Sequence, residues 1–480
     1  MTILELLGDM AYQTNGVEDK AVDAITCDSR QVAQGSLFCA VAGERADGHD
    51  HAAAALDSGA VAVVVQRDLG LPRQIVVEDS RAAYGILCAN FFGNPAGKLK
   101  LMAVTGTNGK TTITYLMKQI LEHAGKKVGL IGTIHNEIGE MTFPAKHTTP
   151  DPFQLHTMFA RMVAAGCEYV VMEVSSHALD QSRVAGCRFL TAAFTNLTQD
   201  HLDYHRDMEN YYGAKKKLFS LCETAVINID DEYGRRLAAE APCRRVTFSC
   251  ENDNADYTAR DIKFSARGSR FALLTKSSLT RVSFGMPGNF SVSNALAAAA
   301  GCVEAGIALD AVVEGLSACA GVPGRIEILP TQTPYTIIRD YAHSPDGLEK
   351  VLTCVRGFAP GRVVTLFGCA GNRDRTKRPK MAEIAARLSD FCILTSDNPR
   401  DEDPKRIAED AIPGFARHDT PYEVIVDRYE AIRWALEHSR ENDVLVLAGK
   451  GHEDYQVLNH GTIYFDEKVI VMELLGLEAE

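Results

Sequence analysis

One segment, TGTNGKTT at residues 105–112, limits what this chain can fold into more than any other part of its sequence. It follows a buried-strand pattern at 101–104 and leads into an amphipathic helix pattern at 111–123, and a further strand is expected at 128–131. A strand, a tight glycine-rich loop, a helix and a second strand form one unit of a parallel sheet covered by helices. The segment therefore predicts an α/β fold with the loop at one edge of the sheet.

The residue types of this loop suit a phosphate ligand. Its glycines allow close backbone approach, and successive N–H groups at a helix start stabilise negative charge. Lys110 would reach the outer phosphates, and Thr111 has a hydroxyl that can ligate Mg²⁺. The spacing departs from the usual phosphate loop, because Val104 occupies the first glycine position. Lys-Thr at the helix start still favours phosphate binding over an ordinary glycine-rich turn.

Strand and helix patterns alternate over most of the chain. Strands are expected at 60–65, 74–77, 101–104, 128–131, 169–174, 189–195, 225–229, 336–340, 363–367, 391–395, 423–426 and 444–447, with short alternating strands at 256–284 and a helix at 291–300. A Gly/Asn/Pro cluster at 93–97 and a glycine turn at 321–324 interrupt the alternation. We therefore expect three domains at 1–97, 98–324 and 325–480, a number that suits the 480-residue length.

Composition excludes several classes of protein. Fifty basic and 63 acidic residues give a net charge of -13, which argues against a nucleic-acid partner. The 13 cysteines form no C-x-x-C pair, so reduced core thiols are expected rather than disulfides or a thiolate zinc site. No apolar run reaches the roughly 18 residues of a membrane span. The acidic start of the chain does not resemble a secretory signal, and a cytoplasmic location is expected.

Candidate metal ligands lie near the ends of the strands that follow the loop. Glu173 comes at the end of a predicted strand, where its carboxylate would face the nucleotide crevice. His201 and His205 stand four residues apart, but the accompanying acid and thiolates of a zinc site are missing. The basic run at 215–217 would by default be a solvated helix face.

In the last predicted domain, four polar segments each follow a predicted strand. They lie at 340–343, 368–378, 397–400 and 449–453. Because ligands of open α/β sheets bind outside the carboxyl ends of the strands, these segments should converge on one crevice.

Taken together, these motifs resemble the ATP-dependent Mur ligases, most closely the MurE type, over essentially the whole chain. The matching segments are Asp28-Ser29-Arg30, Gly35-x-Leu37-Phe38, TGTNGKTT at 105–112, His147-Thr148-Thr149-Pro150, Glu173-Val174-Ser175-Ser176-His177, NLTQDHLDYH at 196–205, Tyr212-Gly213-Ala214-Lys215, Asp340-Tyr341-Ala342-His343, Lys377-Arg378-Pro379, DNPR at 397–400 and GKGHE at 449–453.

The resemblance implies a three-domain enzyme with a UDP-binding N-terminal domain, a central P-loop-type ATPase sheet and a C-terminal Rossmann-like sheet for the incoming amino acid. It implies a ligase of peptidoglycan precursor synthesis, which adds meso-diaminopimelate to UDP-MurNAc-L-Ala-D-Glu. Since a carboxylate is a poor acyl donor, ATP would first convert it to an acyl phosphate, which the amine then attacks with loss of phosphate. ATP enters as a substrate and Mg²⁺ as a cofactor, and a monomer is expected.

The resemblance also implies residue roles. ATP would be held by Gly106, Thr107, Asn108, Gly109, Lys110, Thr111, Thr112, Asn294, Arg325, Asp340 and His343. Mg²⁺ would be held by Thr111, Glu173, His201 and Lys215, and Lys110, Glu173, His201 and Lys215 would be the catalytic set. Lys215 matches a lysine that such ligases carry as a carbamate (N6-carboxylysine), which turns a cation into an anion beside the metal. His343 is nearly as well explained as a hydrogen-bonded structural histidine.

The acceptor would be held by Ser29 and Arg30 at the uridine diphosphate, and by Thr148, Thr149, Ser175, Gln181 and Arg183 around the peptide and its reacting carboxylate. Two plainer interpretations stay open. Arg30 can be merely solvated, and Ser175 can be a helix cap.

The amino-acid site would comprise Arg373, Asp397, Asn398, Arg400, Gly449 and Glu453. Arg400 offers a planar bidentate donor for the distal carboxylate of diaminopimelate, and Arg373 adds a second cation. Lysine would leave these guanidiniums unpaired, which disfavours it. Glu453 and the Gly449 carbonyl suit the accompanying ammonium, while Arg400 as a plain surface residue is the minority interpretation.

Two other functions stay open at this stage. A folylpolyglutamate synthetase shares the ATP half of the pattern but not the DNPR and GKGHE segments. A nucleotide-switched regulator would not ligate anything, and it would have no need for Arg400 and Glu453 at strand ends.

Overall fold

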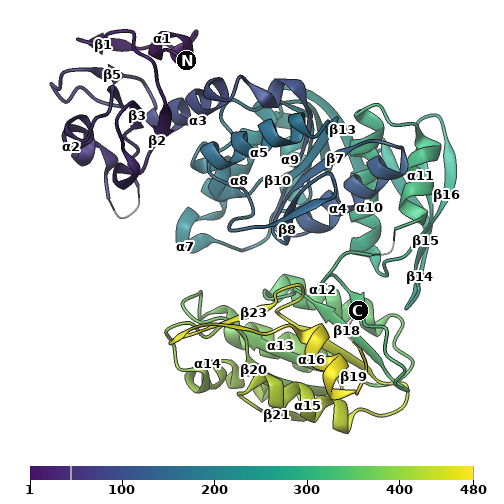
Figure 1. Ribbon diagram of the computed structural model, residues 1–480. Coiled ribbons are helices and arrows are strands. Elements are labelled where there is room, and N and C mark those ends of the chain that lie inside the picture. Colours follow the sequence, from purple (N-terminus) through teal and green to yellow (C-terminus); the bar gives the residue numbers. More distant parts are fainter. Residues whose placement is uncertain (44–45, 320, 479–480) are drawn as a thin grey trace.

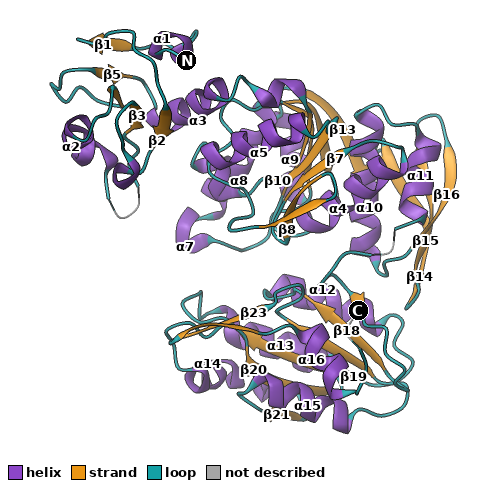
Figure 2. Ribbon diagram, in the orientation of Figure 1, coloured by secondary structure: helices purple, strands orange, loops and turns teal. Residues whose placement is uncertain are grey.

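A computed structural model describes residues 1–43, 46–319 and 321–478. Three large sheets follow one another along the chain, each with helices packed on it, and residues 455–464 form a separate two-stranded sheet (Figures 1 and 2). The predicted α/β class with several domains is confirmed. The expected boundaries at 97–98 and 324–325 stay a prediction, and each falls between two of the sheets.

The N-terminal sheet has the strand order β1-β5-β4-β3-β2, with β1 antiparallel to β5 and the other neighbours parallel. Its elements are α1 (Ile3–Leu7), β1 (Gln13–Asn15), β2 (Ala24–Thr26), η1 (Ser29–Gln31), β3 (Ser36–Cys39), η2 (Gly48–His51), α2 (Ala52–Asp57), β4 (Ala62–Val65), β5 (Gln74–Val76) and α3 (Ser80–Phe91). Helix α3 leads toward the central domain, where its end packs on α5 through Phe91, Phe92 and Phe153.

The central sheet has the order β16-β15-β14-β13-β12-β11-β6-β10-β7-β8-β9. Its strands are β6 (Lys100–Thr105), β7 (Val128–Ile131), β8 (His135–Ile138), β9 (Met141–Pro144), β10 (Tyr169–Glu173), β11 (Phe189–Phe194), β12 (Cys222–Asn228), β13 (Arg244–Ser249), β14 (Tyr257–Ser265), β15 (Gly268–Thr275) and β16 (Leu279–Phe284). From β14 to β7 neighbouring strands run parallel, and antiparallel hairpins extend both ends.

Helices cover both faces of this sheet, so its middle strands are buried on two sides and are mostly apolar. One core contains residues of α4, α10 and α11, and the other contains residues of α5, α8 and α9. The helices of this part are η3 (Pro95–Lys98), α4 (Lys110–His123), α5 (Pro152–Ala164), α6 (Ser176–Asp180), α7 (Leu202–His205), α8 (Met208–Lys216), η4 (Lys217–Ser220), α9 (Glu232–Glu240), α10 (Asn289–Glu304) and α11 (Leu309–Ser317).

The C-terminal sheet has the order β17-β18-β22-β19-β20-β21, in which only β17 pairs antiparallel among the described strands. Its elements are β17 (Glu327–Ile328), β18 (Thr336–Asp340), α12 (Pro345–Arg356), β19 (Val363–Cys369), α13 (Lys377–Leu388), β20 (Phe391–Ser396), α14 (Pro404–Ala411), η5 (Ile412–Arg417), β21 (Tyr422–Val424), α15 (Arg428–His438), β22 (Val444–Ala448), β23 (Tyr455–Leu458), β24 (Gly461–Tyr464) and α16 (Glu467–Leu474). Helices α12, α13 and α14 pack on one face, and α15 and α16 on the other.

Aspartate side chains cap several of these helices, which satisfies backbone N–H groups at the helix starts. Asp79, Asp151, Asp207, Asp231, Asp403, Asp427 and Asp466 each accept a hydrogen bond from the first turn that follows them. Helix α4, which follows the glycine-rich loop, has no side-chain cap in the described structure. Its first N–H groups can therefore be satisfied by a ligand.

Every strand expected from the sequence overlaps an observed one, with ends that differ by a few residues. The predicted helix at 111–123 begins at Lys110 instead. Strands β1, β2, β3, β8, β9, β13, β17, β23 and β24 were not expected. They are short or half-exposed, so their hydrophobic pattern is weak. The cysteines are free thiols, most of them buried, and no described helix has the length and apolar character needed to cross a bilayer.

Leu116 tests how far the central core depends on α4, the helix behind the glycine-rich loop. Its side chain is fully buried. Leu116→Ala should lower the free energy of unfolding by about 3 kcal/mol, because it leaves a cavity in packed surroundings. Urea unfolding followed by circular dichroism measures this. Leu279→Ala is the control at a position 67% exposed, and equal losses in the two variants would contradict the expectation.

Candidate functional site

The glycine-rich loop lies at the carboxyl end of β6, as predicted, and its shape depends on Gly109. This glycine has φ +90°, and a Cβ atom there would come within 2.6 Å of the Asn294 Oδ1 atom. On its other side the loop is held by Asn196, whose backbone carbonyl and side-chain oxygen accept hydrogen bonds from the N–H groups of Thr107 and Asn108 at 2.9 Å each. The loop is thus fixed in place by the two elements beside it.

Two lysines converge on the same carbonyl of this loop. The Lys110 and Lys215 ammonium groups donate hydrogen bonds to the Gly106 carbonyl at 2.9 and 2.8 Å. Lys215 is almost completely buried, and its Nζ atom lies 4.7 Å from the centre of the Tyr211 ring. Burial, and then the charge of Lys110, lower the pKa of Lys215 well below its usual range. The run at 215–217 therefore contains one buried residue and is not simply a solvated helix face.

Glu173 and Thr111 form a compact group of oxygen atoms beside the loop. The Thr111 hydroxyl donates to Glu173 Oε1 at 3.0 Å, and the Thr133 N–H and hydroxyl donate to the same carboxylate at 2.8 and 3.0 Å. Arg325 from the start of the C-terminal part donates to Thr111 Oγ1 at 3.2 Å. A hydroxyl and a carboxylate in contact suit Mg²⁺, which takes few protein ligands and completes its shell with water and phosphate oxygens.

A cavity opens in front of this group, between the central and C-terminal domains. Of the predicted nucleotide residues, its lining contains Thr107, Asn108, Gly109, Lys110, Thr111, Thr112, Asn294, Arg325, Asp340 and His343, together with Glu173, His201 and Thr148. Gly106 and Lys215 are not in the lining. Asp340 is buried and accepts from the Ile326 and Ala342 N–H groups at 2.7 and 2.8 Å.

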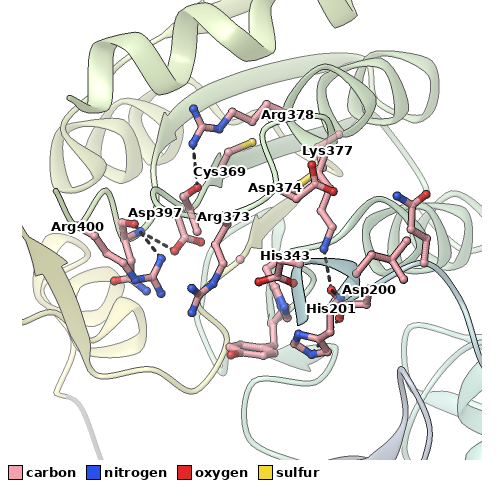
Figure 3. Close-up of a pocket in the computed structure, with 18 of the residues that line it drawn as sticks. Asp200, His201, His343, Cys369, Arg373, Asp374, Lys377, Arg378, Asp397 and Arg400 are labelled. Atoms are coloured by element: carbon pink, nitrogen blue, oxygen red, sulfur yellow. Dashed lines mark hydrogen bonds and ion pairs between the residues drawn. The ribbon is translucent and has the colours of Figure 1, made fainter. Parts of the chain in front are cut away.

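A second cavity of about 370 Å³ lies at the carboxyl ends of the C-terminal strands (Figure 3). All four polar segments contribute to it, which confirms that they converge. Its lining contains the six residues expected at an amino-acid site, namely Arg373, Asp397, Asn398, Arg400, Gly449 and Glu453. Asp200, His201, Tyr341 and His343 line both cavities, so the two share a wall.

Charged groups of both signs line the second cavity. Burial, and then the charge of Arg373, lower the pKa of Arg400, while the carboxylates of Asp397 and Glu453 act in the opposite direction. Two guanidinium groups close enough to repel favour an anion between them. The Glu453 carboxylate accepts from Asn398 Nδ2 at 2.9 Å and from the buried Lys450 Nζ at 3.0 Å. The cavity can therefore bind a carboxylate at one point and polar groups at another.

Ion pairs and hydrogen bonds join the two domains around the shared wall. Lys377 donates to Asp200 Oδ1 at 2.7 Å, and Asn108 in the loop donates to Asp346 Oδ2 at 2.6 Å. Burial alone raises the pKa of Asp200, but the charges of His201 and Lys377 outweigh it and keep the pKa below its usual range. Asp200 is therefore ionised at neutral pH.

His201 immediately precedes α7 in a left-handed conformation with φ +52°, and its ring packs against that of His177. Burial lowers the pKa of His201 to about 4. A neutral imidazole at pH 7 is the form that accepts hydrogen bonds or binds a metal ion. His205, the other member of the pair in the sequence, hydrogen-bonds Ser176 Oγ at 2.9 Å. His343 pairs its Nδ1 atom with the Tyr341 carbonyl at 2.8 Å and is exposed to both cavities.

The residues expected to bind the peptide fall into two groups. Arg183 donates to Gln181 Oε1 at 2.7 Å and to the Thr149 carbonyl at 2.9 Å, so these three lie together. Thr148 is hydrogen-bonded to Thr133 at 3.0 Å and lines the nucleotide cavity. Ser175 accepts a hydrogen bond from the Ala178 N–H at 3.2 Å and so caps α6. This is the plainer interpretation that the sequence left open for Ser175.

Ser29 and Arg30 lie apart from these groups, in η1 of the N-terminal domain. Arg30 forms an ion pair with Asp28 at 2.7 Å, and its side chain is 87% exposed. Arg30 is therefore solvated in this structure, and the role of Ser29 and Arg30 at the uridine diphosphate stays a prediction.

Some residues of the site were not singled out from the sequence. They are Asn196, Asp200, Asp346, Thr133 and Lys450. Asn196, Asp200 and Lys450 lie in segments that the sequence already marked, at 196–205 and 449–453, but no individual role was predicted for them. Nothing local marks Thr133 or Asp346, because their partners come from distant parts of the chain.

Three family models match the chain: the Mur ligase family catalytic domain at residues 21–90, the Mur ligase middle domain at 104–302 and the Mur ligase glutamate ligase domain at 324–451. The middle-domain match includes the glycine-rich loop, and the last includes three of the four polar segments of the second cavity and the start of the fourth.

Full-length relatives agree. The chain is 44% identical to the UDP-N-acetylmuramoyl-L-alanyl-D-glutamate--2,6-diaminopimelate ligase 1 of Clostridium acetobutylicum, over 99% of both chains. It is 45% identical to the corresponding ligase of Geobacillus thermodenitrificans, over 98% of this chain and 97% of that one. A solved structure of a UDP-N-acetylmuramoyl-L-alanyl-D-glutamate--2,6-diaminopimelate ligase matches with a TM-score of 0.71 and 34% identity, over 95% of each chain. The chain belongs to the Mur ligase family, in the branch of the MurE type.

Proposed function

We propose that this protein ligates meso-diaminopimelate to UDP-MurNAc-L-Ala-D-Glu at the expense of ATP, in the synthesis of peptidoglycan precursors. The observation that carries the proposal is the pair of cavities with a common wall. One is built on a glycine-rich loop with a lysine and an oxygen-rich metal position, and the other contains two guanidinium groups and a carboxylate. Phosphoryl transfer and amine attack can therefore occur side by side.

The nucleotide cavity would bind ATP through the loop and the start of α4. Lys110 neutralises the outer phosphates, and the uncapped N–H groups of α4 donate to them. Asn294, Arg325, Asp340 and His343 would surround the base and ribose. Thr111, Glu173, His201 and the carbamate of Lys215 would hold Mg²⁺. When bound, Mg²⁺ neutralises charge on the phosphates during transfer.

The reaction has two steps. The glutamyl carboxylate attacks the γ-phosphorus of ATP, ADP leaves, and an acyl phosphate forms. The amine of the amino acid then attacks the acyl carbon, the C–O bond to phosphate breaks, and the amine loses a proton as the amide forms. The residues of the chain orient both reactants and exclude water from the acyl phosphate, which would otherwise hydrolyse.

Lys215 suits the carbamate role. A carbamate forms when a neutral amine adds to CO₂ and loses a proton, and burial lowers the pKa of Lys215, which favours the neutral amine. The resulting anion would lie beside Lys110, whose positive charge stabilises it.

The acceptor would extend from the N-terminal domain to the shared wall. Arg183, which Gln181 and the Thr149 carbonyl hold in place, is the guanidinium available on this side for a peptide carboxylate. Thr148 and Ser175 would contact the peptide near its reacting end, and Ser29 and Arg30 the uridine diphosphate. The three domains would be residues 1–97, 98–324 and 325–480, in a cytoplasmic monomer.

Diaminopimelate is favoured over lysine by the charges of the second cavity. Arg400 and Arg373 offer cationic donors for its distal carboxylate, while Asp397, Asn398, Glu453 and the Gly449 carbonyl face the ammonium. Binding the carboxylate would remove the repulsion between the two guanidiniums. Lysine has no distal carboxylate, so it would leave this repulsion in place.

The reaction is tested by phosphate release from ATP in the presence of UDP-MurNAc-L-Ala-D-Glu and one amino acid at a time. We expect release to require meso-diaminopimelate, with L-lysine giving at most about a hundredth of its rate. Preference for lysine would overturn the specificity. Stimulation by glutamate with a folate would indicate a folylpolyglutamate synthetase, and nucleotide binding without any ligation would indicate a regulator.

Lys215→Ala should reduce ligation by roughly 100-fold or more, because the anion beside the phosphates is lost. ATP binding, followed by calorimetry, should persist. Lys216→Ala is the matched control, since that lysine is only partly buried and is paired with Glu240. Near-normal turnover of Lys215→Ala would refute the role. Because protonation of the amine releases CO₂, activity should also fall as pH drops, and added bicarbonate should restore part of it.

Arg400→Lys keeps the charge but loses the planar pair of donors. The kcat/KM for diaminopimelate should fall about 10-fold or more, while the KM for ATP stays within about twofold. Arg375→Lys, at an exposed arginine paired with Glu402, is the control. Unchanged kcat/KM in Arg400→Lys would show that the distal carboxylate binds elsewhere.

A further inference from the structure

A buried ion pair lies directly behind the amino-acid cavity. Arg428 is the first residue of α15 and Glu467 the first of α16. Both side chains are inaccessible to solvent, and the Arg428 Nε atom donates to Glu467 Oε1 at 2.8 Å. Neither residue is in the lining of the cavity, so neither can contact a bound amino acid directly.

The other nitrogens of Arg428 bind the backbone of the cavity loops. Nη1 donates to the Ser396 carbonyl at 3.0 Å, and Nη2 donates to the Ala448 carbonyl at 2.8 Å. These are the last residues of β20 and β22. The next residues along the chain are Asp397 and Gly449, both of which line the cavity.

The two strands are not neighbours in the sheet. Strand β19 lies between β20 and β22, so no ladder hydrogen bond fixes their ends relative to each other. The Arg428 guanidinium spans this gap with a rigid planar group. It therefore sets the separation of two cavity loops that the sheet alone leaves less constrained.

Gly449 shows how closely these parts fit. It has φ +117°, and a Cβ atom there would come within 2.7 Å of Asp397 Oδ2 and 3.8 Å of Arg428 Nη2. A second buried side chain supports the same loop, because Gln456 Nε2 donates to the Asp397 carbonyl at 2.7 Å. The carbonyls of two consecutive residues, Ser396 and Asp397, therefore both accept hydrogen bonds from buried side chains.

Stability alone does not explain a buried ion pair, since well-packed apolar residues often stabilise such a position as well or better. We propose that Arg428 is a positioning residue for the amino-acid site. Held by Glu467, it fixes the loops that carry Asp397 and Gly449 and so determines the affinity for the incoming amino acid. This inference rests on the proposed function.

Arg428→Lys tests it, because one ammonium cannot hold two carbonyls and Glu467 in the same geometry. We expect the KM for meso-diaminopimelate to rise about 10-fold or more, since small displacements of positioning groups are costly, while the KM values for ATP and the UDP-dipeptide change less than about twofold. Calorimetric binding of diaminopimelate should weaken in parallel. The fluorescence of Trp434, which lies on the same helix, checks that α15 stays packed on β20.

Arg362→Lys is the matched control. Arg362 forms a bidentate pair with Asp443, with distances of 3.1 and 2.6 Å, at the opposite ends of β19 and β22. It should lose stability without a selective change in the KM for diaminopimelate. A double variant, Arg428→Met with Glu467→Leu, replaces the pair by apolar groups and should fold while it shows the same selective rise in KM.

Two results would overturn the proposal. One is an unchanged KM for diaminopimelate in both Arg428 variants, and the other is an equal rise in all three KM values. Failure of the proposed function is seen separately, because the unaltered enzyme would then release no phosphate in response to diaminopimelate.

Discussion

Parallel pairing of β6 with β10 and β11 is the constraint on which the rest of the site depends. It brings the glycine-rich loop, Glu173 and the segment after Phe194 to one edge of the central sheet. Thr111 and Glu173 are 62 residues apart in the sequence, yet their side chains meet because two strand ends are neighbours. The same rule brings four loops of the C-terminal sheet together, and the two edges face each other.

Much of this arrangement could be predicted from the sequence, because it follows from local patterns. Buried strands appear as apolar runs, and polar clusters that follow them mark the active edge. The six residues expected at the amino-acid site all line one cavity. The short hairpins were missed because half-exposed strands leave little pattern, as in β8 and β9.

What could not be predicted is which side chains from distant segments of the chain pair with each other. Lys377 pairs with Asp200 across two domains, and nothing near either residue indicates the other. The burial of Lys215 is a similar case, since its neighbours Lys216 and Lys217 form exposed ion pairs. Arg428 begins an ordinary amphipathic helix in the sequence, and only the packing of α16 gives it a buried partner. Tertiary context decides these outcomes.

The wall formed by Asp200, His201, Tyr341 and His343 also affects how long the acyl phosphate survives. Asp200 and His201 come from the central domain, and Tyr341 and His343 from the C-terminal one. If the domains separated, this wall would no longer divide the two cavities, and both would open to bulk solvent. The lifetime of an acyl phosphate formed here therefore depends on how long the two domains stay together. If they opened too early, water would hydrolyse it and ATP would be consumed without ligation.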